Sequence, residues 1–155
     1  MKKSELAVMA LAMAQISVEK VPVKLAYAIA KNRGKIKEEM LALEAARQPL
    51  KEFEEKRIEL CRELCDKDAN GKPIMEEKEG MAGRAKSFKG IAGNDEFQRR
   101  LDVLKKSYKK VFDELEAIEN QEADEVNFHM VDIETLPNEI QPGVLEALMP
   151  MIRDS

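Results

Sequence analysis

A seven-residue apolar repeat between residues 97 and 118 constrains the fold of this chain more than any other feature of its sequence. Its members recur at alternating steps of four and three residues: Phe97, Leu101, Leu104, Tyr108, Val111, Leu115 and Ile118. Such a repeat is typical of a coiled-coil seam, in which one face of a helix is buried against another helix. The sequence therefore predicts a helix over residues 94–123, with Asn94 as its N-cap, that needs a partner helix.

A looser version of the same repeat precedes it, between residues 22 and 65. Its apolar positions are Ile29, Ile36, Leu43, Leu50 and Leu64, with Ala46, Phe53 and Leu60 between them. Gly34 weakens this predicted helix, and Pro49 removes a backbone donor and should kink it. A polar, glycine-rich segment joins the two repeats. We therefore expect a mainly α fold built on a long antiparallel two-helix coiled-coil hairpin.

The unequal lengths of the two helices predict how the rest of the chain is used. The second helix is too short to cover residues 22–35, which carry apolar side chains that something else must bury. An N-terminal helix from Ser4 to Ile16 and the C-terminal segment are available for this purpose. Ser4 is the expected N-cap of this helix, and Leu6, Met9, Met13 and Ile16 share the face that it would bury. The prediction is a single domain over residues 1–155, with a head (1–35 and 124–155), a stalk (36–65 and 95–123) and a tip loop (66–94).

The C-terminal segment predicts a strand and a last short helix. Val126, Phe128, Met130 and Ile133 alternate with polar residues, as in a half-buried strand, and a helix is expected over residues 142–152. Because a lone strand is not stable, it needs a second strand in the tip, in the head or in another chain. An irregular extended segment lying on the helices is the alternative.

Charge and cysteine content narrow the class of partner. Lys and Arg number 26 against 30 Asp and Glu, which gives a net charge of −4 and argues against nucleic acid as the main partner. The two signs are expected to be interleaved along the helices.

Cys61 and Cys65 do not form a disulfide framework, so a reducing, cytoplasmic compartment is expected. No apolar run approaches the roughly 20 residues of a membrane span, so no membrane partner is expected.

The segment after the first long helix matches the spacing of a calcium-binding EF-hand loop. Oxygen ligands would come from Asp66, Asp68, Asn70 and Glu77, with Gly71 at the turn. Pro73 stands where a working loop needs a backbone amide, and the sequence offers no second hand. Asn-Gly is also a common tight-turn dipeptide, so a helix end followed by a hairpin turn accounts for the same residues and is favoured over calcium binding.

Three cations in the tip loop, Arg84, Lys86 and Lys89, are candidates for contact with an anionic partner. Solvated charges on the tip are the simpler interpretation. The sequence shows no nucleophile with a spacing-defined base, and the helical carboxylates sit where lysines and arginines four residues away can pair with them. The chain is therefore not expected to be an enzyme and is expected to hold no cofactor.

The order of these segments resembles that of small helical proteins of unknown function encoded by tailed phages and prophages of Gram-positive bacteria. The resemblance is carried by residues 22–32, the turn 67–73, Ile133, Leu136-Pro137 and the face formed by Leu145, Leu148 and Ile152. It implies a non-enzymatic viral protein of the host cytoplasm that acts through protein contacts. It implies no functional residues.

The resulting hypothesis is an interaction protein whose partner is a virion-assembly component or a host factor, including a defence enzyme that it inhibits. Binding would use the tip loop or apolar positions left open on the head. Because heptads form seams within one chain or between two, a homodimer stays open as well. The alternative function is a calcium-responsive module with a single EF-hand-like loop at residues 66–77.

Overall fold

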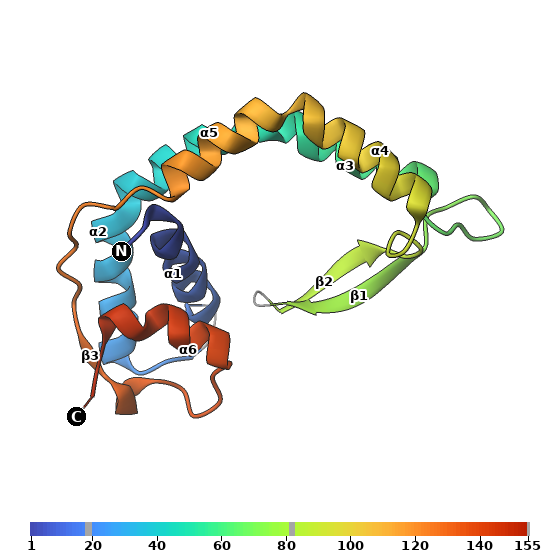
Figure 1. Ribbon diagram of the computed structural model, residues 1–155. Helices are drawn as coiled ribbons and strands as arrows, with labels where there is room; N and C mark the ends of the chain where they lie inside the picture. Colours follow the sequence, from blue (N-terminus) through green and yellow to red (C-terminus); the bar gives the residue numbers. More distant parts are fainter. Residues whose placement is uncertain (18–19, 81–82, 155) are drawn as a thin grey trace. The chain divides into compact units, whose positions relative to one another are not determined.

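The chain is mainly helical and divides into two units in the computed structural model, which describes residues 1–17, 20–80 and 83–154 (Figure 1). Unit 1 comprises Met1–Ala45 and Ile118–Ser155, and unit 2 comprises Ala46–Ala117. The helices are α1 (Lys3–Ile16), α2 (Val23–Arg47), α3 (Leu50–Leu64), α4 (Asp95–Ser107), α5 (Lys109–Glu119) and α6 (Pro142–Leu148). The strands are β1 (Met75–Gly80), β2 (Gly83–Phe88), β3 (Val131–Asp132) and β4 (Ile152–Arg153).

Both of the long helices predicted from the heptads are divided. The first is interrupted at Gln48 and Pro49 because proline has no N–H to donate to the preceding turn. The second is interrupted at Tyr108, whose N–H bonds to the carbonyl of Lys105 at 3.1 Å and so tightens the turn. It then ends at Glu119. The structure therefore does not confirm one long hairpin of two continuous helices.

In unit 2, α3 and α4 lie side by side and bury the centre of the predicted seam (Figure 1). The buried side chains are Phe53, Leu60, Cys61, Phe97 and Leu101. The Phe53 ring also meets Phe112 edge-on, with ring centroids 4.9 Å apart.

Burial raises the pKa of the Cys61 thiol, so the thiol stays protonated and packs as a small apolar group. The Asn94 side chain accepts a bond from the N–H of Phe97 at 3.0 Å, which confirms the predicted helix cap.

The tip segment contains a β-hairpin that the sequence analysis did not predict. β1 and β2 pair antiparallel, in a register that sets Glu77 opposite Lys86 and Glu79 opposite Arg84. Backbone bonds anchor its base: Ile74 N–H donates to the Asp66 carbonyl at 2.8 Å, and Asp66 N–H donates to the Lys89 carbonyl at 2.9 Å. Opposite charges across a strand pair are stabilising, so this polar sequence suits a hairpin.

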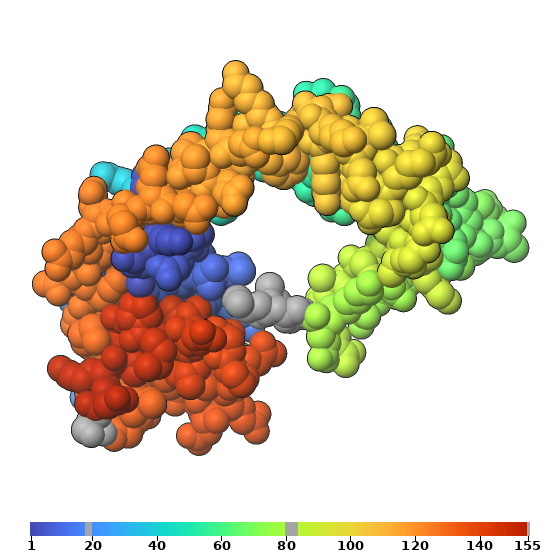
Figure 2. Space-filling view, in the orientation of Figure 1, coloured from blue at the N-terminus to red at the C-terminus, as the bar shows by residue number. Residues whose placement is uncertain are grey.

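Unit 1 is built around α1, α2 and α6, and α1 and α6 lie side by side on the face seen in Figure 2. The predicted buried face of the first helix is confirmed, since Leu6, Met9, Met13 and Ile16 are all in the core. Its predicted cap is wrong, because Lys2 rather than Ser4 precedes the helix. The Glu5 carboxylate accepts the Lys2 N–H at 2.6 Å and satisfies the free helix end in place of a serine hydroxyl.

The predicted strand over residues 126–133 is much shorter in the structure. Val131–Asp132 alone is β-strand, and it pairs in parallel with Ile152–Arg153. The partner strand thus comes from the C-terminal end of the same unit. The predicted helix over residues 142–152 ends at Leu148 and continues as a 3₁₀ helix over Met149–Met151, which contains Pro150. Within the described residues, no helix has the length and apolar content to cross a membrane.

Candidate functional site

Two of the four residues of the EF-hand-like loop, Asp68 and Asn70, form a compact turn. The Asp68 carboxylate accepts bonds from the N–H groups of Asn70 and Lys72, each at 2.9 Å, as in an Asx turn. The Asp66 carboxylate lies against Gly90, and Glu77 sits on β1 beside Arg84, 3.5 Å away. Among the described residues, no group of three or more His, Cys, Asp or Glu side chains is placed to hold a metal ion. Calcium binding at these positions stays a prediction.

The three cations of the tip lie on or just after β2. Arg84 is 3.5 Å from the Glu77 carboxylate and 3.7 Å from that of Glu79. Lys86 faces Glu77 in the strand register, and Lys89 follows the strand. Acidic side chains of β1 therefore offset the charges of Arg84 and Lys86 locally. Partner binding through these cations stays a prediction, and the hairpin does not concentrate positive charge.

Helix α2 exposes a second apolar face, opposite the one it buries in the core. Val23 is 84%, Tyr27 52% and Leu41 55% exposed, and the exposed residues Ala30 and Gly34 lie between them. These five residues, which we call the α2 stripe, follow one another at steps of four, three, four and seven residues. That spacing keeps them on one side of a helix. Single exposed apolar residues need no explanation, but a heptad-spaced row on one helix resembles a docking face.

Positive charge flanks the α2 stripe on both sides. Residues 20–37 contain six Lys or Arg and no Asp or Glu: Lys20, Lys24, Lys31, Arg33, Lys35 and Lys37. At about 100° per residue, Lys24 and Lys31 fall on one flank, and Arg33 and Lys37 on the other. The Lys31 ammonium lies 5.7 Å from the centre of the Tyr27 ring, so it is attracted to the stripe itself.

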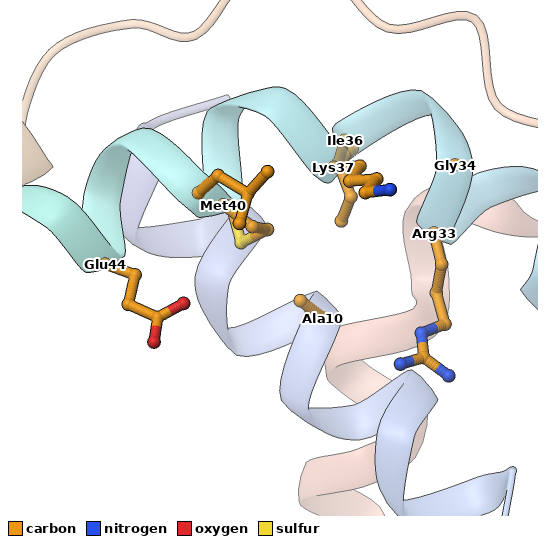
Figure 3. A pocket seen from close by; sticks show the side chains of 8 residues that line it. Ala10, Arg33, Gly34, Ile36, Lys37, Met40 and Glu44 are labelled. Carbon is orange, nitrogen blue, oxygen red and sulfur yellow. The ribbon is translucent and has the colours of Figure 1, made fainter.

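A cleft of about 410 Å³, the α1 cleft, adjoins the stripe between α1 and α2 (Figure 3). Its lining residues are Ala10, Arg33, Gly34, Ile36, Lys37, Met40, Leu41 and Glu44. Ala10 faces it from α1, and Arg33 and Glu44 project from α2 at its opposite ends (Figure 3). A Cβ added at Gly34 would meet no atom within 4 Å. The cleft is thus an apolar hollow with Arg33 and Lys37 at its rim, Glu44 at one end and open space above Gly34.

A second cleft, of about 600 Å³, lies on the other flank of the stripe, and we call it the His129 cleft. Its lining residues are Val23, Lys24, Tyr27, His129, Met130, Val131, Asp132, Thr135 and Arg153. The Tyr27 and His129 rings meet edge-on, with centroids 5.2 Å apart. Arg153 Nε donates to Asp132 at 2.9 Å and closes one side. Aromatic rings, methionine and arginine are side chains enriched in protein–protein interfaces.

The sequence predicts part of this surface. The expectation that residues 22–35 need a cover holds for Leu25 and Ile29, which are buried in the unit 1 core. Val23 and Tyr27 of the same stretch are exposed instead. The prediction that the two signs of charge are interleaved along the helices is wrong for two stretches. Residues 20–37 lack acids, and residues 111–152 contain eleven Asp or Glu and no Lys or Arg. The acid-free stretch was the signal that could have identified the site.

Comparison with known proteins found no matching family model, no similar curated protein and no similar solved structure. The function has to be argued from this surface.

Proposed function

We propose that this protein acts without catalysis, by binding another protein through the α2 stripe and the clefts beside it. The observation that carries the proposal is the row of exposed apolar residues on α2, with Val23 84% and Tyr27 52% exposed. Leaving such residues in water forgoes the free energy that their burial would release. Their place on a long helix packed into the core makes the surface rigid, which lowers the entropy lost on binding.

The partner that we propose is a virion-assembly component or a host factor, including a defence enzyme that the protein would inhibit. The resemblance to small phage and prophage proteins supports this part of the proposal, as does the absence of a disulfide between the free thiols of Cys61 and Cys65, which suits a host cytoplasm. The surface chemistry supports the binding itself. The two parts are independent, and a partner from another source would leave the surface assignment intact.

Affinity capture with three forms of the full-length protein tests the proposal. They are the parent, a stripe variant (Val23→Glu with Tyr27→Glu) and a hairpin variant (Arg84→Gln, Lys86→Gln and Lys89→Gln), which removes the three charges without setting like charges across the strand pair. All substituted side chains are exposed, so all three forms should melt at similar temperatures. We expect the parent and the hairpin variant to retain a common protein and the stripe variant to lose it.

The opposite pattern would move the binding surface to the hairpin. Equal capture by all three forms would mean that neither surface is used. A parent that retains no protein above the level of an unrelated control would overturn the proposed function.

A further inference from the structure

We propose that the occupant of the α2 stripe is an acidic amphipathic helix of the partner, packed along residues 23–41 and crossing α2 at Gly34. This inference rests on the proposed function and adds the chemistry of the partner. Residues 23–41 span roughly 27 Å at 1.5 Å per residue, which matches about five turns of a second helix.

The first argument is charge complementarity. Four of the six cations of residues 20–37, Lys24, Lys31, Arg33 and Lys37, lie on the two flanks of the stripe, and acids follow directly after them at positions 38 and 39. Glu39 is already paired with Lys3, at 3.2 Å. Within the part of the chain that the structure describes, no carboxylate pairs with Lys24, Arg33 or Lys37. A helix with acids on both sides of its apolar row would meet cations on either flank, and such complementarity sets partner choice and register.

The second argument is the shape of the stripe. Its large side chains, Val23, Tyr27 and Leu41, stand toward its ends, and the small residues Ala30 and Gly34 lie between them. Gly34 lies in the interior of a helix, where glycine is less favourable than alanine, and among the described residues no atom lies within 4 Å of a Cβ added there. A glycine at such a place lets another backbone approach closely. Side chains of a helix crossing there can enter the α1 cleft on one side and the His129 cleft on the other.

The surroundings favour a protein helix over other anionic partners. A phosphate backbone is neutralised by lysines and arginines and gains nothing from an apolar row between them. Residues 118–152 of the same unit also carry eight Asp or Glu without Lys or Arg, which opposes a polyanion at longer range. A membrane-surface helix buries a broad apolar face, whereas the core of unit 1 already occupies the broad face of α2.

Site-specific photo-crosslinking tests the identity of the occupant. A photoreactive phenylalanine analogue replaces Tyr27 or Leu41 in the full-length protein, and the cross-linked segment is sequenced by mass spectrometry. We expect both positions to cross-link to one protein segment that is rich in Asp and Glu and has helical apolar spacing. A basic or non-periodic segment, or a cross-link to nucleic acid or lipid, would overturn this inference. No protein cross-linked at either position would overturn the proposed function itself.

Two matched pairs of variants then test the contact with a synthetic peptide of the cross-linked segment. Gly34→Ala and Gly34→Trp both enter open space, so both should fold. We expect Gly34→Ala to keep affinity within about threefold and Gly34→Trp to lose about tenfold or more, because the indole separates the helices. Equal affinity of the two variants would overturn the proposed crossing at Gly34.

The second pair tests charge. Arg33→Glu with Lys37→Glu should weaken binding by about a hundredfold and flatten its dependence on salt. Lys51→Glu with Lys105→Glu changes the net charge equally at exposed positions outside unit 1 and should leave binding within about threefold. Equal loss in both would show a general effect of charge and overturn the assignment of an acidic helix to these flanks.

Discussion

The Asn32 side chain holds the backbone of His129 by two hydrogen bonds. Its Nδ2 donates to the His129 carbonyl at 2.9 Å, and its Oδ1 accepts the His129 N–H at 2.7 Å. Asn32 is 0% exposed and is the one buried polar residue of the described chain. Because this pairing joins α2 to an extended segment 97 residues away, it fixes one wall of the His129 cleft. Asn32 lies on a seam position of the first heptad repeat, and its side chain pairs with the backbone of a distant segment.

Removing this amide should destabilise unit 1. Asn32→Ala leaves the N–H and C=O of His129 without partners, and we expect a loss of about 2–3 kcal/mol in the free energy of unfolding. Asn127→Ala is the matched control, because the Asn127 side chain is exposed and makes no hydrogen bond among the described residues, so its loss should change stability by less than about 0.5 kcal/mol. Urea denaturation measures both. Equal midpoints would mean that the pairing contributes nothing.

Gly90 should resist substitution for two separable reasons. Its φ is 84°, where an L-residue costs about 1–2 kcal/mol, and an added Cβ would lie 2.3 Å from Asp66 Oδ1. Gly90→Ala should therefore destabilise more than Gly71→Ala, whose φ of 76° carries the first cost without the clash. Adding Asp66→Ala to Gly90→Ala should recover the difference and leave the cost of the φ angle. Thermal melting of Gly71→Ala, Gly90→Ala, Asp66→Ala and the double variant checks this cycle, and a double variant as unstable as Gly90→Ala alone would contradict it.

The heptad core of unit 2 predicts opposite outcomes for two positions of α4. Phe97 is 7% exposed and Val103 is 62% exposed. Phe97→Asp forces a carboxylate among apolar side chains and should cost about 3 kcal/mol or more. Leu104→Asp should act in the same direction, and Val103→Asp should stay within about 0.5 kcal/mol of the parent. Melting followed by circular dichroism distinguishes them. If Phe97→Asp melted like the parent, the assignment of the α3–α4 core would be wrong.

Acid should weaken one contact between α3 and α4. Arg100 donates to both oxygens of Glu63, at 2.8 and 3.0 Å, and this bonding holds the pKa of Glu63 below its ordinary value. A lowered pKa in the folded state stabilises above the unfolded value of about 4.3 and is lost as the pH falls through the folded value. Glu63→Gln should therefore lower the denaturation midpoint slightly at pH 7 and leave it unchanged at about pH 3.

The matched control is Glu59→Gln, which removes an exposed carboxylate from the same helix. At pH 7 it should lower the midpoint by less than Glu63→Gln does, because it breaks no bond to Arg100. A Glu63→Gln difference that persisted in acid would show that the Glu63–Arg100 pair is not its source.

The features that the sequence predicted correctly are those set by near neighbours. The buried face of α1, the Asn94 cap and the burial of Phe97 and Leu101 follow from periodicity and capping within a few residues. The β1–β2 hairpin was not predicted because its strands lack the alternation of apolar and polar residues that marks a half-buried strand. Backbone pairing and the position of Glu79 opposite Arg84 specify the hairpin instead. The position of Glu79 opposite Arg84 can be recognised only when the register of the two strands is known.

The sequence by itself determined the helical character of the chain, the apolar face of α1 and the centre of the unit 2 seam, because helix periodicity is a local property of the backbone. The tertiary structure decided the parallel pairing of Val131 with Ile152, the hold of Asn32 on His129 and the exposure of Val23 and Tyr27. These features depend on which distant segments of the chain pack against α2. Bringing such segments together lowers the conformational entropy of the chain, and this loss is offset only when the whole core of unit 1 forms. The candidate interaction surface belongs to this second group, since an exposed face is defined by what the rest of the fold leaves uncovered.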